Sequence, residues 1–485
     1  MKRHLRLTPV LLLAALLAGC QGPCEKLGRI AAPTTSAGSA DFSRFVAVGT
    51  SISAGYQSGG LVNRHQVYAY PALFAKQTGK TVQLDGQGTF SLPAVDGNGL
   101  APLLQLRSLS PVIISNSGLV PGTPINTTWP TPYSNLGVPG AILYDFTNLT
   151  NYGTGLFPLV ARGANTLQTQ LLAQNPTFIS FEFGANEVLG PATSGSAVTP
   201  AGVPASTWNA IASPAAYGAM LGGALATIHG AAPTAKIAIA NVPDVRSIPF
   251  FTTFPPLTKD VRNGAVRGLL GWVHRDSAFT IHVPVPAPHD STGHTIVIKL
   301  DSLTVSDLVT LKAQASLYAG IGFRPFTYNY VANTLNGTGA GLDSAFVLDS
   351  LEQVVIGGKV ATMNAAVDAR AASAWIVKVD LNGLLASLTT NGTTIRGTHY
   401  TTAYVSGGLF SLDGVHPTDL GHALIANLMI NAVNAKFGST LPNLVLPDYT
   451  TGSSSQAQPV RAGEKLLNIR RIDGLGASLR ALFDR

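Results

Sequence analysis

Four short apolar runs, separated by segments of helical periodicity, constrain the fold of this chain more than any other feature. The runs are long enough for strands buried on both faces, and they cover residues 45–48, 178–181, 237–240 and 375–379. Apolar residues at helical spacing precede the second, third and fourth runs, at residues 167–172, 216–228 and 351–372. This alternation predicts an α/β fold with a mostly parallel sheet, helices on both faces, and functional sites at the carboxyl ends of strands.

Two long segments interrupt the alternation, at about residues 82–134 and 252–345, and both are rich in Gly, Pro, Ser, Thr and Asn. We expect them to be insertions with short strands of their own, because structureless loops of this length are uncommon in compact domains. The folded domain then spans residues 42–446. Residues 447–485 form a Gly- and Ser-containing linker and a basic tail, which the sparse apolar residues predict to be a solvated helix or disordered.

The amino terminus has the layout of an export signal, with Lys2, Arg3 and Arg6 followed by an apolar run over residues 9–19. This run is shorter than the roughly 20 residues that a bilayer-spanning helix needs, so the sequence predicts a cleaved signal peptide over residues 1–19. The formal charge of +7 includes the three leader cations, and without them it is +4. A modestly basic chain without basic blocks argues against nucleic acid binding.

The segment Leu-Ala-Gly-Cys at residues 17–20 resembles the bacterial lipobox, in which the cysteine receives a diacylglycerol. The resemblance implies that Cys20 is lipidated and that residues 20–41 are a tether. Gln21 stands where an Asp would signal inner-membrane retention, which implies delivery to the outer membrane, on either its periplasmic or its outward side. The alternative is an ordinary cleavage site nearby, with Cys20 incidental or paired with Cys24.

The first apolar run leads directly into a small-residue turn, Gly49-Thr50-Ser51-Ile52. Such a turn presents the Ser51 hydroxyl at the carboxyl end of a strand and can direct the Ser51 amide at an incoming carbonyl oxygen. Taken alone, the motif also suits any strand-to-helix turn or a phosphate-binding loop.

Asp413 and His416 lie three residues apart in a Gly- and Pro-containing loop that precedes an apolar, helix-like run at residues 423–433. At this spacing the carboxylate can fix the imidazole tautomer, so the pair is a candidate general base with its orienting acid. The pair could instead be half of a metal site, but no Cys or His cluster supplies the other ligands. His422 is the rival candidate for the general base. We favour His416 because it stands in the Asp413–Pro417 motif.

Two further segments complete a pattern, Asn-Leu-Gly-Val-Pro-Gly-Ala at residues 135–141 and Gly-Ala-Asn-Glu at residues 184–187. With the turn at Ser51 and the loop at His416, the chain has four blocks in the order found in the SGNH/GDSL hydrolases, which it resembles over about residues 42–438. The resemblance implies a three-layer α/β/α sandwich with about five strands (a flavodoxin-like fold). The chain differs from the usual family pattern at two positions, because Thr50 and Glu187 each stand where the family commonly has an Asp.

The same resemblance assigns roles to residues. Ser51 falls on the nucleophile, Asp413 and His416 on the other triad members, and Gly140 and Asn186 on the oxyanion hole, which the Ser51 amide completes. It implies a lipase or esterase that cleaves carboxylic esters through an acyl-enzyme, without metal or organic cofactor. Lipid esters, short acyl esters and acetylated polysaccharides all suit this chemistry, and we expect the insertions to shape the acyl pocket or a lid.

Two other classes of function stay open. An acyltransferase would use the same triad and pass the acyl group to an alcohol other than water. A non-catalytic surface lipoprotein would retain the fold, but such proteins usually lose one member of the set, and all five residues are present. The chain has no Gly-x-Ser-x-Gly motif, which disfavours an ordinary α/β-hydrolase.

Overall fold

The computed structural model describes residues 35–450, apart from short gaps and much of residues 255–341, and it also describes residues 469–472. The short gaps are residues 101–102, 110–111, 131, 152–154, 162–164 and 201. The predicted signal peptide and Cys20 lie outside the described residues. A compact unit begins at Ala37, slightly before the predicted start at residue 42. The reason is that the Ser39 amide and hydroxyl donate to the Phe437 carbonyl, at 2.8 and 3.1 Å, and fix this segment to the domain.

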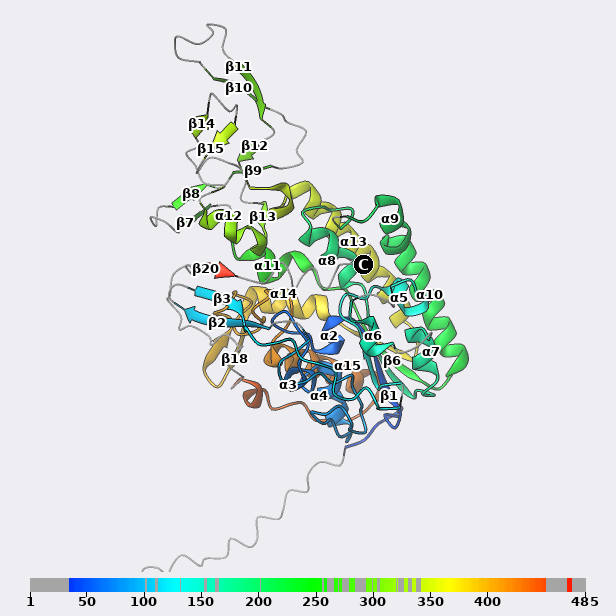
Figure 1. The fold of residues 1–485 in the computed structure, drawn as a ribbon. Coiled ribbons are helices and arrows are strands. Elements are labelled where there is room, and N and C mark those ends of the chain that lie inside the picture. Colours follow the sequence, from blue (N-terminus) through cyan, green and yellow to red (C-terminus); the bar gives the residue numbers. More distant parts are fainter. Residues whose placement is uncertain are drawn as a thin grey trace, which may run out of the picture. The chain divides into compact units, whose positions relative to one another are not determined.

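The core of the unit is a five-stranded sheet with the order β17-β6-β5-β1-β4, in which every pairing is parallel (Figure 1). Its strands are β1 (Phe45–Gly49), β4 (Asn135–Gly137), β5 (Phe178–Glu182), β6 (Lys236–Ala240) and β17 (Ile376–Val379). The α/β fold and the four predicted strands are therefore confirmed. The fifth strand, β4, falls in the segment that the sequence marked only as a motif, and it pairs with β1.

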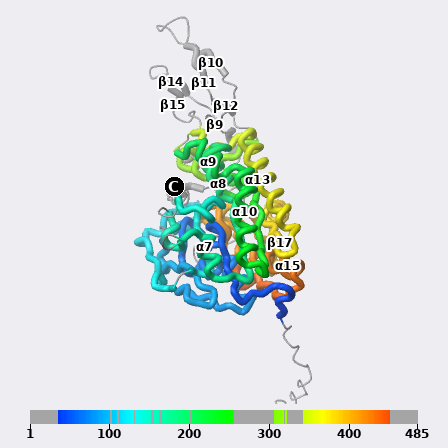
Figure 2. Tube along the Cα trace, turned by 90° about the vertical axis from the view of Figure 1, so that its right-hand side faces the viewer, coloured from blue at the N-terminus to red at the C-terminus, as the bar shows by residue number. Residues whose placement is uncertain are grey.

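Alternate residues along the strands are buried against two different layers of helices. Val46 and Val48 belong to one apolar cluster and Phe45 and Ala47 to another, because successive side chains of a strand point to opposite faces. The first cluster includes residues of α7 (Leu167–Leu172), α10 (Pro214–Ala231) and α13 (Ser350–Ala371), and the second includes α4 (Tyr70–Gln77) and α15 (Asp419–Phe437). Figure 2 shows α10 and α13 packed side by side on the sheet face that the first cluster covers.

The long helices have stop and start signals that the sequence explains. Asp349 and Glu352 form a capping box at the start of α13. The Thr418 side chain caps α15, and Gly438 ends that helix in the left-handed conformation at φ 69°. The other α-helices are α2 (Ser51–Ala54), α3 (Asn63–Gln66), α5 (Leu143–Thr147), α6 (Phe157–Val160), α8 (Ala185–Thr193), α9 (Ala205–Ala212), α11 (Pro249–Thr252), α12 (Gln314–Tyr318) and α14 (Leu381–Asn391).

Within the described part of the chain, no helix by itself has the length and apolar character needed to cross a bilayer. Among the described helices, α9 and α10 taken together, bent by 42° at the break between them, meet that criterion of length and composition. Short 3₁₀ helices lie at Val245–Ser247 (η2), Leu311–Ala313 (η3), Ser344–Phe346 (η5) and Leu446–Tyr449 (η6).

The two interrupting segments contain short strands outside the main sheet, as predicted. In the first, β2 (Leu104–Leu109) pairs antiparallel with β3 (Val112–Asn116). In and around the second are β7 (Leu257–Lys259), β8 (Val266–Gly268), β9 (Leu270–Trp272), β10 (Phe279–Val283), β11 (His294–Ile298), β12 (Leu300–Ser302), β13 (Leu308–Val309), β14 (Thr327–Asn329), β15 (Thr334–Asn336) and β16 (Val347–Leu348). A hairpin of β18 (Thr393–Ile395) and β19 (Thr398–Tyr400) follows α14.

The prediction of a helix or disorder for the basic tail is wrong at residues 469–472. These residues form β20 (Ile469–Ile472), which pairs parallel with β3. The pairing is made by backbone groups at a free edge of β3, so it depends little on the side chains from which the sequence prediction was made.

Candidate active site

The turn that carries Ser51 begins where β1 ends. Thr50 has an extended backbone, at φ −105° and ψ −155°, and Ser51 is the first residue of the short helix α2. Gly49 is required before this turn, because a Cβ there would lie 2.3 Å from Ser53 Oγ and 2.6 Å from the Glu182 carbonyl oxygen. The turn therefore brings the Ser51 hydroxyl to the carboxyl edge of the sheet, as the sequence predicted.

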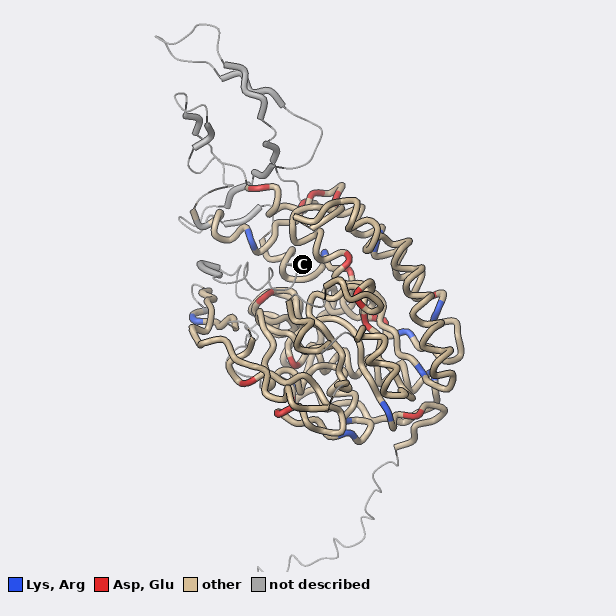
Figure 3. Tube along the Cα trace, turned by 45° about the vertical axis from the view of Figure 1, so that its right-hand side comes forward, with Lys and Arg blue, Asp and Glu red and all other residues tan. Residues whose placement is uncertain are grey.

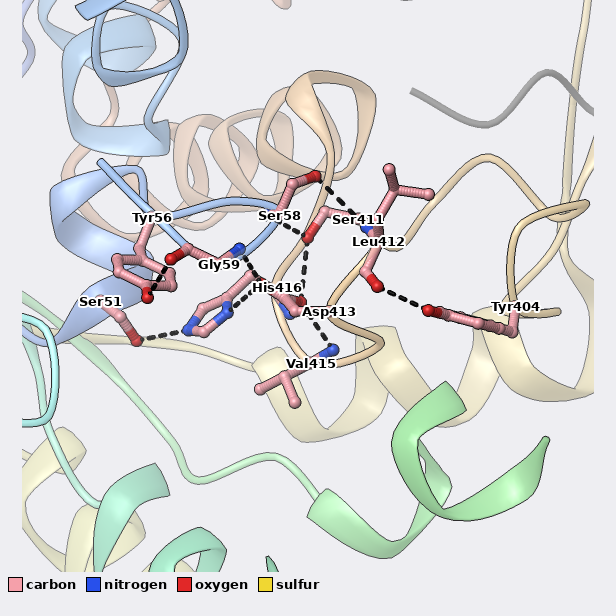
Figure 4. Close-up of polar contacts among 10 residues, drawn as sticks. All are labelled: Ser51, Tyr56, Ser58, Gly59, Tyr404, Ser411, Leu412, Asp413, Val415 and His416. Atoms are coloured by element: carbon pink, nitrogen blue, oxygen red, sulfur yellow. Dashed lines mark hydrogen bonds and ion pairs between the residues drawn. The ribbon is translucent and has the colours of Figure 1, made fainter. Parts of the chain in front are cut away.

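Ser51, His416 and Asp413 form a continuous chain of hydrogen bonds, although the first lies 365 residues before the second (Figure 4). His416 Nε2 lies 2.8 Å from Ser51 Oγ, and His416 Nδ1 lies 2.9 Å from Asp413 Oδ2. All three side chains are buried. This is the arrangement of a nucleophile, a base and a residue that orients the base.

Asp413 is held by several donors besides the imidazole. Its Oδ1 accepts from the Val415 and His416 amides, both at 2.9 Å, and from Ser411 Oγ at 3.0 Å. Its Oδ2 also accepts from the Gly59 amide at 3.1 Å. Burial favours a higher pKa for Asp413, but the opposing charge and hydrogen bonds of His416, with the Val415 amide, hold this pKa below its usual value. An ionised Asp413 keeps the proton on Nδ1 of the imidazole, so that Nε2 can accept the Ser51 proton.

Two tyrosines that the sequence did not single out support this loop. The Tyr56 ring lies against the His416 ring, with centroids 4.8 Å apart, and its hydroxyl donates to the Gly59 carbonyl at 2.6 Å. The Tyr404 hydroxyl donates to the Leu412 carbonyl at 2.5 Å. Figure 4 shows both tyrosines flanking the loop that carries Asp413 and His416. Tyr56 thus packs directly on the imidazole, and Tyr404 is hydrogen-bonded to the backbone of the residue before Asp413.

Glu182, the last residue of β5, lies directly behind the nucleophile turn and was also missed. Its Oε2 accepts from the Thr50 amide at 2.9 Å and from Ser53 Oγ at 2.9 Å, and its Oε1 accepts from Thr50 Oγ1 at 2.9 Å. Burial raises the pKa of Glu182, and the hydrogen bonds from Thr50 and Ser53 oppose that increase. Glu182 thus fixes residues on both sides of Ser51. The signal available in the sequence was a carboxylate ending a strand that is otherwise apolar.

Gly140 and Asn186 follow the two strands that flank β1. Gly140 comes shortly after β4, and Asn186 is the second residue of α8, which follows β5. Because the three strands are parallel neighbours, their carboxyl ends bring these residues to the same edge as Ser51. Asn186 Nδ2 donates to the Ala141 carbonyl at 2.8 Å, which ties the two candidate oxyanion segments together. Gly140 has φ 82°, a backbone conformation that favours glycine.

Glu187, one of the two departures from the family pattern, is buried and accepts from the Leu143 amide at 2.7 Å. It therefore anchors the start of α5, in the loop that follows Gly140. This contact is structural and leaves the adjacent Asn186 in place.

His422 does not take part in the triad. It is fully buried, neither of its ring nitrogens has a hydrogen-bond partner, and burial lowers its pKa to about 3. His65 forms a second histidine–carboxylate pair, at 2.9 Å from Asp419 Oδ1, which also accepts from Gln57 at 2.7 Å. That pair connects α3 to the first turn of α15. Of the histidines in the described residues, His416 is the one hydrogen-bonded to Ser51.

The metal-ligating and basic side chains of the described residues are dispersed. No group of three or more His, Cys, Asp or Glu side chains there could hold a metal ion. Figure 3 shows the Lys and Arg residues of the described part scattered along the chain rather than gathered on one element.

In comparisons with known proteins, no protein-family model, no curated protein and no solved structure matches this chain.

Proposed function

We propose that this chain is a serine hydrolase of carboxylic esters, of the SGNH/GDSL type that its four sequence blocks resemble. The observation that carries the proposal is the hydrogen-bonded series Ser51 Oγ, His416 Nε2 and Nδ1, and Asp413, at 2.8 and 2.9 Å. Chance rarely brings a serine, a histidine and a carboxylate into this series at the carboxyl edge of a parallel sheet, with each side chain buried.

In the proposed reaction, His416 Nε2 takes the Ser51 hydroxyl proton while Oγ attacks the ester carbonyl carbon. The oxyanion accepts from the Ser51 and Gly140 amides and from the Asn186 side chain. His416 then returns the proton to the alcohol oxygen as the carbon–oxygen bond breaks, which leaves an acyl group on Ser51. Water, deprotonated by His416, attacks that acyl group and releases the acid and the free serine. Asp413 stabilises the imidazolium form at each stage.

We also propose a subcellular location, the outer membrane of a bacterium, to which a lipid on Cys20 anchors the domain. The sequence pattern at residues 17–20 supports this proposal. Metabolic labelling with radioactive palmitate tests it: label that persists in a Cys20→Ala variant would exclude this anchor.

Hydrolysis of a p-nitrophenyl ester series by the purified full-length chain tests the activity. We expect Ser51→Ala and His416→Ala to abolish turnover above the uncatalysed rate while thermal unfolding shows a folded protein. His399→Ala is a matched control, because the His399 side chain is exposed and its Nδ1 lies 3.3 Å from Thr394 Oγ1 in the β18–β19 hairpin, outside the triad. A folded wild type that hydrolyses no ester, or a Ser51→Ala variant as active as wild type, would contradict the proposal.

An acyltransferase is distinguished by its products. Addition of a competing alcohol should give mainly free acid if water is the natural acceptor. Mainly transesterified product at low alcohol concentration would favour the transferase.

A further inference from the structure

An apolar pocket of about 80 Å³ lies beside the residues of the triad. Three of its lining residues are immediate chain neighbours of those residues: Ile52 follows Ser51, and Val415 and Pro417 flank His416. Figure 4 shows Val415 within the loop that carries Asp413 and His416. The pocket is therefore lined by chain neighbours of the nucleophile and of the base, and not by Ser51 or His416 themselves.

One wall of the pocket is a face of helix α14. Leu381, Leu384, Leu385 and Leu388 line it, and the spacing of three and four residues places them on one side of the helix. Leu381 and Leu385 are buried, whereas Leu384 and Leu388 stay partly exposed. The facing wall comes from residues 409–410 and from α15, and no charged side chain lines the pocket.

The pocket and Gly140 lie on opposite sides of Ser51 along the sheet edge. Pro243, which follows β6, and Leu381, which follows β17, line the pocket, and both strands lie on the far side of β5 from β1. Gly140 follows β4, on the other side of β1. This order along the sheet edge is the one that an ester at Ser51 needs if its carbonyl oxygen points towards Gly140 and one of its substituents points towards the pocket.

We propose that this pocket binds a short aliphatic group of the ester, so that the preferred substrates carry an unbranched chain of about three or four carbons. The proposal rests on the ester hydrolase function above. An apolar cavity of about 150 Å³ accommodates a benzene ring, so one of roughly half that volume suits about half as many carbons. The lining lacks hydrogen-bonding side chains for a sugar, which disfavours a polysaccharide chain in this position.

The proposal predicts the size of the chain-length preference. Burial of one methylene group contributes enough free energy for about a four-fold change in kcat/KM, so two methylene groups give about 15-fold. The ratio of kcat/KM for the butyryl ester to that for the acetyl ester should thus be about 15 if the acyl chain enters the pocket. Chains that exceed the pocket should gain nothing further.

The experiment compares two ester series with the purified full-length chain. One series varies the acyl group from acetyl to octanoyl on p-nitrophenol, and the other varies the alcohol from ethanol to octanol on acetate. We expect a rise up to a three- or four-carbon chain in one series, which identifies the group that enters the pocket. Leu384→Trp should fill the pocket and bring the four-carbon to two-carbon ratio close to one, and Leu388→Ala should enlarge it and move the optimum to longer chains.

Leu351→Trp is the matched control, since Leu351 is an exposed leucine at the start of α13 and does not line the pocket. Its chain-length ratio should equal that of the wild type. Flat profiles in both series, or profiles that neither Leu384→Trp nor Leu388→Ala alters in folded protein, would overturn the pocket proposal and leave the ester hydrolase function standing. Absence of both ester turnover and covalent labelling of Ser51 by a fluorophosphonate would remove the function, and the pocket proposal with it.

Discussion

Replacement of Glu182 tests whether the buried carboxylate behind Ser51 positions the nucleophile. Glu182→Ala removes the acceptor for three donors, the Thr50 amide, Thr50 Oγ1 and Ser53 Oγ. The hydroxyls can turn to other partners, and Ser53 Oγ already lies 3.2 Å from the Tyr70 hydroxyl. The Thr50 amide cannot turn. One buried donor left unpaired costs about 1–3 kcal/mol, so with the cavity we expect a loss of about 3 kcal/mol in the free energy of unfolding.

The substitution should also lower kcat in the protein that remains folded. A displacement of about 1 Å at a reacting group can lower the rate about 10²-fold, so we expect kcat to fall by roughly that factor with little change in KM. Glu182→Gln should restore most of the activity. Its amide oxygen can accept from the Thr50 amide, and its amide nitrogen can donate to Thr50 Oγ1, which as a hydroxyl can also accept.

The pH dependence of stability gives a second measurement. Because the pKa of Glu182 is raised in the fold, its contribution to stability is complete below the unfolded pKa of about 4.3 and is lost as the pH rises towards the folded value. Glu182→Gln cannot titrate. Relative to wild type, its deficit in the free energy of unfolding should therefore be smaller at pH 8 than at pH 5, as measured by urea denaturation.

Glu352→Ala provides the control, because Glu352 is also a buried glutamate but caps α13, where its Oε2 accepts from the Asp349 amide. It should lose about 1 kcal/mol of stability without a change in kcat. A folded Glu182→Ala variant with wild-type kcat would refute the positioning role. A Glu182→Gln variant as slow as the alanine variant would also refute the reasoning, since hydrogen-bond geometry would then not explain the effect.

Three further substitutions test other parts of the site. Asn186→Ala should lower kcat about 10²- to 10³-fold with little effect on KM in p-nitrophenyl ester kinetics, and a change in KM alone would argue against an oxyanion role. Asp413→Asn should lower kcat about 10⁴-fold. Because the pKa of Asp413 is lowered, its stabilising contribution is lost as the pH falls through the folded value, so the Tm of this variant should vary less than that of wild type between pH 7 and pH 3. His422→Leu should stay active and, because the pKa of His422 is about 3, gain about 2 kcal/mol more stability at pH 5 than at pH 8 by urea denaturation; loss of activity would reopen the choice of base.

The sequence predicted the parts of the fold that depend on local pattern. Four strands of the sheet coincide with short, mainly apolar runs, and the structure has all four. The fifth, Asn135–Gly137, has three residues with a polar residue first and a glycine last, so no periodicity could distinguish it from a loop. Its strand conformation comes from pairing with β1, which is a tertiary effect.

The candidate site was predictable where short motifs carry the chemistry, and not where distant residues meet. Ser51 and His416 each stand in a recognisable loop, and the structure joins them. Glu182 lies 132 residues from Thr50, and only the parallel pairing of β1 with β5 brings them together. The apolar pocket shows the same limit, because its described lining joins α14, residues 409–425 and single residues near β1 and β6 that lie far apart in the sequence.

The structure also gives a physical reason for Thr50, which stands where the resembling family usually has an Asp. The Thr50 hydroxyl donates to both Glu182 oxygens, at 2.9 and 3.0 Å, within a buried environment. An Asp at this position would put a second carboxylate against the first, and two like charges at about 3 Å cannot both ionise without a large cost. A short donor at residue 50 is therefore what a glutamate at residue 182 requires. The departure from the family pattern is matched by its partner across the sheet, and the two residues are best regarded as one unit that supports the Ser51 turn.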